Sequence, residues 1–71
     1  MNNGTTKVVL RDYDNKVVKS WRLQDPNKIG IALNKAILLA GELNDKTQRV
    51  YHVDGFLNEV RTCYRRVDSD R

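Results

Sequence analysis

The stretch VDGFLNEVRTCYRRV, residues 53–67, decides how the second half of this chain folds. It contains Asp54-Gly55, a dipeptide that favours the turn of a β-hairpin. It also contains apolar residues at helical spacing, which at about 100° per residue share an arc of about 120°. The residues in that arc are Val53, Phe56, Leu57, Val60, Cys63, Tyr64 and Val67.

The helical interpretation of this stretch is favoured over the hairpin. A strand requires alternation, and adjacent apolar residues at 56–57 and 63–64 interrupt it. Asp54 can cap a helix that starts near Gly55, and two arginines in the last turn suit the helix dipole. The sequence therefore predicts a helix over residues 55–67 with a buried apolar stripe. The alternative, in which Asp54-Gly55 is a hairpin turn, stays open.

Two β-rich runs precede this stretch and flank Asp14-Asn15. Both of these residues tolerate the left-handed conformation that a tight hairpin turn needs. The sequence therefore predicts strands over residues 6–13 and 16–23, joined by a two-residue turn.

That turn fixes the pairing, with Val8 opposite Trp21 and Arg11 opposite Val18. Side chains alternate across a strand, so the two faces can be assigned. The predicted core face holds Val8, Leu10, Val17, Trp21 and Leu23, with Lys19 as an intruder. The other face holds Lys7, Val9, Arg11, Tyr13, Lys16, Val18, Ser20 and Arg22.

A helix is predicted from Asp25 to Asn44. Asp25 is a good N-cap, Pro26 suits the first helical position, and Asn44 is a plausible stop. The predicted core arc of this helix is Ile29, Ala32, Leu33, Ala36, Ile37, Leu39, Ala40 and Leu43. A third strand is predicted over residues 47–53, where β-branched and aromatic residues follow the helix.

The predicted fold class is α+β, in the order β-β-α-β-α. Such a domain has a three-stranded antiparallel sheet with two helices on one face. The expected organisation is a loose N-terminal segment at 1–5, a single domain at 6–67 and a polar tail at 68–71. A chain of 71 residues is one domain at most and gains from oligomerisation.

Composition narrows the class of partner without choosing one. The net charge is +4, which favours nucleic acid, nucleotides or acidic proteins. A single cysteine, Cys63, excludes an intrachain disulfide and, with no export signal, fits a reducing cytoplasm. No Cys/His cluster is present, so no metal or cofactor is expected.

Catalysis is not expected. The single histidine, His52, could share a strand face with Asp54, but nothing ties a nucleophile such as Ser20 to the pair. Cys63 lies on the predicted apolar stripe, where a buried, inert thiol is usual.

The predicted binding site is the basic sheet face. Cations along a phosphate backbone, with an aromatic ring available for stacking, are typical of single-strand nucleic-acid binding. The predicted anion-binding residues are Lys7, Arg11, Tyr13, Lys16 and Arg22, with Arg61 and Arg65 from the last helix. The competing interpretation is an ordinary solvated sheet face.

A second apolar sector of the first helix predicts self-association. Ile31 and Leu38 are seven residues apart, and small residues beside them permit a close helix–helix approach. The predicted contact is Gly30, Ile31, Asn34, Leu38 and Gly41. The sequence therefore predicts a small cytoplasmic, non-enzymatic module, a homodimer that binds nucleic acid. The alternatives are a protein-interaction, regulatory or inhibitor module, or a dimer that holds a phosphorylated small molecule at its seam.

Overall fold

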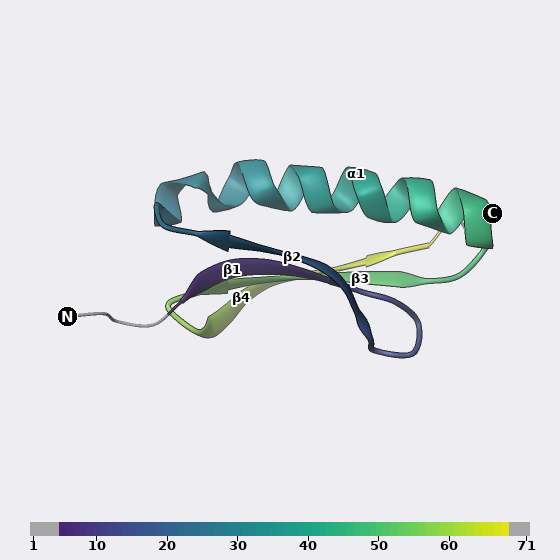
Figure 1. The fold of residues 1–71 in the computed structure, drawn as a ribbon, viewed down its shortest axis with the longest axis horizontal. Coiled ribbons are helices and arrows are strands. Elements are labelled where there is room, and N and C mark those ends of the chain that lie inside the picture. The colour runs from purple at the N-terminus through teal and green to yellow at the C-terminus, as the bar shows by residue number, and fades with distance from the viewer. Residues whose placement is uncertain (1–4, 69–71) are drawn as a thin grey trace.

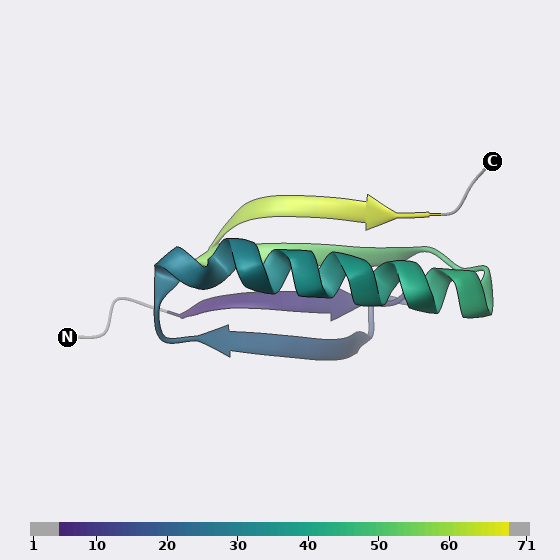
Figure 2. The same cartoon turned by 90° about the horizontal axis from the view of Figure 1, so that it is seen from above.

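A computed structural model, which describes residues 5–68, shows a four-stranded antiparallel sheet with one long helix on one face (Figure 1). The spatial order of the strands is β2-β1-β3-β4. The helix lies above the two central strands, and the two edge strands flank it (Figure 2). The elements are β1 (Thr6–Arg11), β2 (Val17–Leu23), the short 3₁₀ helix η1 (Pro26–Lys28), α1 (Ile29–Thr47), β3 (Tyr51–Leu57) and β4 (Val60–Val67).

The predicted terminal segments fall largely outside the described residues. Residues 1–4 and 69–71 are not described, so the expected loose N-terminus and most of the polar tail lie beyond what the structure covers. At the described boundary, the carbonyl of Thr5 accepts a hydrogen bond from the Glu59 backbone N–H at 2.9 Å.

The first hairpin has the predicted register over most of its length. Val8 pairs with Trp21, and the same alignment holds for every pair from Thr6 to Leu10. The turn is different, because its loop has three residues, of which Asn15 has a φ of 68°. The extra turn residue is compensated by a bulge, so Arg11 pairs with Val17 and not with Val18.

The helix begins where the sequence predicts and ends three residues later. Asp25 accepts a hydrogen bond from the Asn27 backbone N–H, and Pro26 opens the 3₁₀ turn that leads into α1. The expected stop at Asn44 is wrong, because α1 continues to Thr47. The Asn44 side chain is buried within the last turns and donates to the Arg49 carbonyl at 2.6 Å. The helix ends at a left-handed residue, Gln48.

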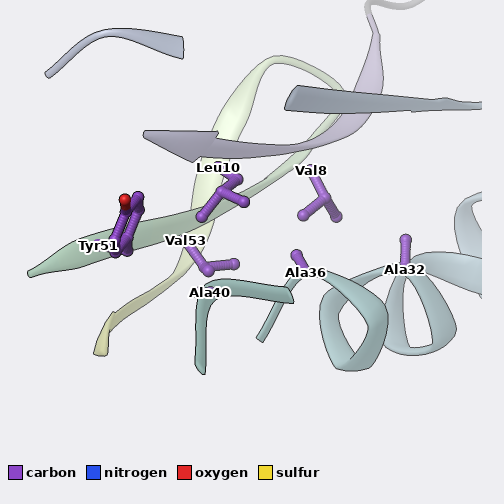
Figure 3. Packing of buried hydrophobic residues seen from close by; sticks show 7 residues of the cluster. All are labelled: Val8, Leu10, Ala32, Ala36, Ala40, Tyr51 and Val53. Carbon is purple, nitrogen blue, oxygen red and sulfur yellow. The ribbon is translucent and has the colours of Figure 1, made fainter. Parts of the chain in front are cut away.

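The core lies between α1 and the sheet (Figure 3). Three alanines spaced by four residues form one row of α1 that faces the strands. Their short side chains allow the helix to pack close to the sheet. The larger predicted members of the arc, such as Leu33 and Ile37, pack around this row and are partly buried. The predicted helix face is therefore confirmed, and the buried core is Val8, Leu10, Ala32, Ala36, Ala40, Tyr51 and Val53.

The predicted fold is wrong in its second half, where a hairpin replaces the expected second helix. Residues 51–57 and 60–67 form β3 and β4, so the sheet has four strands and the described chain has one long helix. The expected strand over 47–53 starts too early, since Thr47 is the last residue of α1. The hairpin turns at Asn58-Glu59, whose φ values are 53° and 71°, and not at Asp54-Gly55.

The misleading helical stripe has a physical origin. Phe56 and Leu57 lie on opposite faces of β3, and both faces of the sheet carry apolar side chains, so simple alternation is lost. A bulge near Thr62 shifts the phase of β4 in the same region. Within the supposed stripe, Val60 is 63% and Tyr64 48% exposed, so burial of the whole stripe is also wrong.

Gly55 lies inside β3 on the face that packs against α1. A Cβ at this position would lie 3.2 Å from Leu33 Cδ2 and 3.4 Å from Cys63 Cβ. The glycine is therefore needed for the approach of α1, and its place beside Asp54 is unrelated to a turn.

Replacing Glu59 by glycine should stabilise the protein. Glu59 occupies the left-handed region, which costs a non-glycine residue roughly 1 kcal/mol, whereas glycine adopts it freely. We expect Glu59→Gly to raise the free energy of unfolding by about 0.5–1 kcal/mol in urea titrations. Glu59→Ala removes the same charge but keeps the strain, so it should give no gain. Equal effects of the two variants would contradict the turn geometry.

Candidate functional site

The sheet face opposite α1, here called the open face, presents twelve side chains in three rows that cross the strands. The outer strands of a four-stranded sheet lie about 14 Å apart, and successive rows about 7 Å apart. In the order β2-β1-β3-β4, the first row is Arg22, Lys7, Phe56 and Arg61. The middle row is Ser20, Val9, Asp54 and Tyr64, and the third row is Val17, Arg11, His52 and Arg66.

The first and third rows are basic, and the one carboxylate within these three rows is Asp54 of the middle row. Beside the third row, Arg66 pairs with the carboxylate of Asp68. Lys7 and Arg22 occupy directly paired positions on β1 and β2. Like charges in such positions destabilise a sheet, since their side chains lie close together. Lys7 Nζ lies 5.3 Å from the Phe56 ring centroid, which offsets part of this repulsion. The open face therefore concentrates positive charge at some cost to stability.

Asp54 organises the centre of the open face. Its side chain has no exposed surface, and it forms ion pairs with Arg11 of β1 and Arg61 of β4. The Arg61 Nη1 to Asp54 Oδ1 distance is 3.2 Å. One buried carboxylate thus fixes two arginines from the two strands that neighbour β3. Three charges combine to +1, so the cluster still attracts anions.

Tyr64 and His52 form an aromatic pair beside this cluster. The Tyr64 hydroxyl lies 2.7 Å from His52 Nδ1, and the two rings stack with centroids 5.8 Å apart and an interplanar angle of 19°. Arg61 Cζ lies 5.5 Å from the Tyr64 ring centroid. Tyr64 nevertheless remains half exposed, so its ring is both held in place and accessible.

A shallow depression of about 350 Å³ lies between β1 and β2 on the open face. Its floor is apolar, and its rim carries a hydroxyl and two cations. The lining residues are Lys7, Val9, Val17, Ser20 and Arg22. This chemistry suits a flat or anionic group more than an apolar ligand.

The structure brings together four of the seven predicted anion-binding residues. Lys7, Arg11, Arg22 and Arg61 lie on the open face. Tyr13 and Lys16 belong to the hairpin turn instead, where Arg49 Cζ lies 4.4 Å from the Tyr13 ring centroid.

Arg65 does not lie on the open face with the four predicted residues. It pairs with Val53, which faces the core, so Arg65 projects on the helix side of edge strand β4. The expected Arg61/Arg65 stripe depends on helical spacing and is wrong, because the segment is a strand.

Six open-face residues were missed by sequence reasoning. Val17 was predicted on the core face, but the bulge in the first hairpin places it opposite Arg11, and it is 62% exposed. The other five are His52, Asp54, Phe56, Tyr64 and Arg66. The helical interpretation assigned most of them elsewhere. The alternation of His52, Asp54 and Phe56 was the available signal, since alternate residues of a strand share a face. His52 and Asp54 do share that face, but their hydrogen-bond partners are Tyr64 for His52 and arginines for Asp54.

The predicted self-association residues lie along the exposed crest of α1, opposite the sheet. Ile31 and Leu38 are 58% and 69% exposed. At Gly30 and Gly41 an added Cβ would meet nothing within 4 Å, so the surface beside the two apolar residues is open. Asn34 is exposed between them.

Residues 5–68 contain no cluster of three or more His, Cys, Asp or Glu that could hold a metal ion. In the same range, no helix is long and apolar enough to cross a membrane. No known protein-family model matches the chain, and neither curated proteins nor solved structures give a significant match. Function must therefore be inferred from the open face and the crest of α1.

Replacing Asp54 by asparagine should destabilise the protein more than other carboxylate losses. Each carboxylate oxygen of Asp54 accepts from a different arginine, and the amide replaces one of these oxygens with an NH2 group that cannot accept. Both ion pairs with the buried group are also lost. We expect a loss of about 1–3 kcal/mol in the free energy of unfolding. Asp68→Asn is the control, because Asp68 pairs with the exposed Arg66 at 3.2 Å and should cost under about 1 kcal/mol. Similar losses in both variants would show that Asp54 does not organise the open face.

Proposed function

We propose that this chain is a small non-enzymatic binding module that recognises nucleic acid through its open face. The observation that supports this most directly is the direct pairing of Lys7 with Arg22 inside a basic row. A sheet face that only needs to be solvated gains nothing from a like-charge pair. A phosphate between the two cations would remove the repulsion, because each could donate to it.

The distribution of charge favours an extended anion over a single small one. Basic side chains occur at both ends of the first row and on either side of the middle row, over a sheet about 14 Å wide. A nucleic-acid backbone presents phosphates at regular intervals, so one molecule can contact several of these cations at once.

We also propose that the protein is a homodimer that associates through the crest of α1. Basic residues lie near the start of α1, with Lys28 just before it and Lys35 in its first half. Acidic residues Glu42 and Asp45 lie in its second half, where Lys46 is the exception. Two helices that pack antiparallel about a two-fold axis would bring these opposite charges together around Ile31 and Leu38. The occupant of the crest is then a second copy of this chain.

Such a dimer favours nucleic acid over a small molecule at the seam. The crest and the open face lie on opposite sides of the molecule (Figure 1). Association through the crest would therefore leave both open faces on the outside, where each can contact a strand. A cytoplasmic location, suggested by the lone thiol, is part of the same proposal.

Reversing the charge of Arg22 should weaken nucleic-acid binding without destabilising the fold. In Arg22→Glu the new carboxylate lies opposite Lys7, which turns a repulsive pair into an attractive one. We expect the free energy of unfolding to stay the same or to rise by up to about 1 kcal/mol. Affinity for a labelled oligonucleotide at low ionic strength should fall roughly tenfold, with a shallower salt dependence.

Arg65→Glu provides the matched control, since it changes the net charge equally but projects on the helix side of edge strand β4. This variant should bind almost as well as the parent. If both variants lose the same affinity, only net charge matters. Absence of salt-sensitive binding in the parent would refute the proposal.

Leu38→Glu should convert the dimer into a folded monomer. Leu38 is largely exposed in the single chain, so the charge costs little there, but it would be buried and unpaired in the dimer. Sedimentation velocity should show the change. Val60→Glu, at an equally exposed apolar residue near the β3–β4 turn, should remain dimeric. A parent protein that sediments as a folded monomer would refute self-association and leave the crest as a candidate surface for a different protein.

A further inference from the structure

Tyr64 has features that the charge of the open face does not explain. It lies on edge strand β4, in the middle row, between a first and a third row that each contain arginines. Its ring is half exposed although its hydroxyl is hydrogen-bonded to His52. An aromatic ring that is held rigidly and left accessible is well suited to stack on a ligand, because little conformational freedom is lost on contact.

We propose that the open face binds single-stranded nucleic acid by stacking an unpaired base on the Tyr64–His52 pair. This inference rests on the proposed function and specifies its ligand. The two rings already stack on each other with an interplanar angle of 19°, so a base would extend an existing aromatic stack, here called the platform. Base–aromatic stacking accepts any base, since each has a π-face.

The cations around the platform suit the backbone of such a strand. Arg61 belongs to the first row and Arg66 to the third, so they lie on β4 at about 7 Å on either side of Tyr64. Asp54 holds Arg61 of β4 beside the platform, and it holds Arg11 of β1 on the opposite side of β3. A phosphate on one side of the stacked base would therefore find the Arg61 guanidinium already positioned by Asp54. On the other side it would find Arg66, which Asp68 contacts at 3.2 Å.

A duplex does not fit this surface equally well. Its bases are stacked on each other, and reading their edges takes a helix or a ribbon that enters a groove. The open face is a sheet surface whose aromatic groups need an unstacked base. We therefore expect single strands to bind more tightly than a duplex of the same sequence.

The test compares Tyr64 with Tyr13, a second tyrosine of almost equal exposure, 48% against 50%, which lies in the β1–β2 turn. Binding of labelled single-stranded DNA, single-stranded RNA and duplex DNA is measured by fluorescence anisotropy. Tyr64→Ala should bind both single strands about tenfold more weakly, while Tyr13→Ala stays within about twofold of the parent. Circular dichroism checks that both variants fold.

Two further arms separate stacking from a structural role of Tyr64. Tyr64→Phe keeps the ring and loses the hydroxyl that contacts His52, so it should lose less affinity than Tyr64→Ala, whereas Tyr64→Leu should lose as much as Tyr64→Ala. On a single strand with an abasic stretch, the phosphates remain and the bases are gone, so Tyr64→Ala should then bind as the parent does. The DNA and RNA arms decide which single strand is preferred.

The outcomes distinguish this inference from the proposed function. Equal binding of duplex and single strand, with Tyr64→Ala as neutral as Tyr13→Ala, overturns the stacking platform and leaves nucleic-acid binding by charge. Loss of affinity in Tyr64→Ala that persists on the abasic strand also overturns it. No salt-sensitive binding to any of the three nucleic acids overturns both.

Discussion

The close approach of one helix to one face of the sheet is the constraint on which the rest of this structure depends. The approach is possible because α1 turns an alanine row toward the strands and because position 55 has no side chain to meet Leu33. A single helix covers only the central strands and only one face. The other face must then remain stable in water without a second layer, and it does so with charged side chains gathered around a buried carboxylate. On β3, Gly55 thus leaves room for the helix on one face, and Asp54 pairs with the arginines on the other face.

Local signals predicted the first half of the chain, and the second half shows where they fail. The register of the first hairpin and the core face of α1 follow from alternation and helical spacing, because most apolar residues of each element there lie on the face that packs in the core. In β3 and β4 the open face also carries apolar rings, a bulge shifts the phase, and the turn uses Asn58-Glu59 without glycine. Each departure weakens the strand pattern, and together they produce a helical spacing by coincidence.

The same error explains which part of the candidate site was predictable. Lys7, Arg11 and Arg22 came from the first hairpin, whose faces were assigned correctly except near the turn, and the structure keeps these three on one surface. Tyr64 and Arg66 depended on the pairing of β4, a contact between strands that no local pattern specified. Asp54 is the clearest case. In the sequence it looked like a turn or a helix cap, and only the pairing of β3 with both neighbours places it between two arginines.

The stability of the open face and the anion binding proposed for it are coupled through these charged pairs. Asp54 lowers the repulsion between arginines that would otherwise face each other across β3, so the central cations are held at little cost. Lys7 and Arg22 have no such carboxylate between them among the described residues, and their repulsion persists in the unbound protein. A bound phosphate would place a negative charge between Lys7 and Arg22, as Asp54 does between Arg11 and Arg61. The Lys7–Arg22 pair at the β1–β2 edge is therefore where the proposed anionic ligand would relieve a repulsion that the protein itself leaves uncompensated.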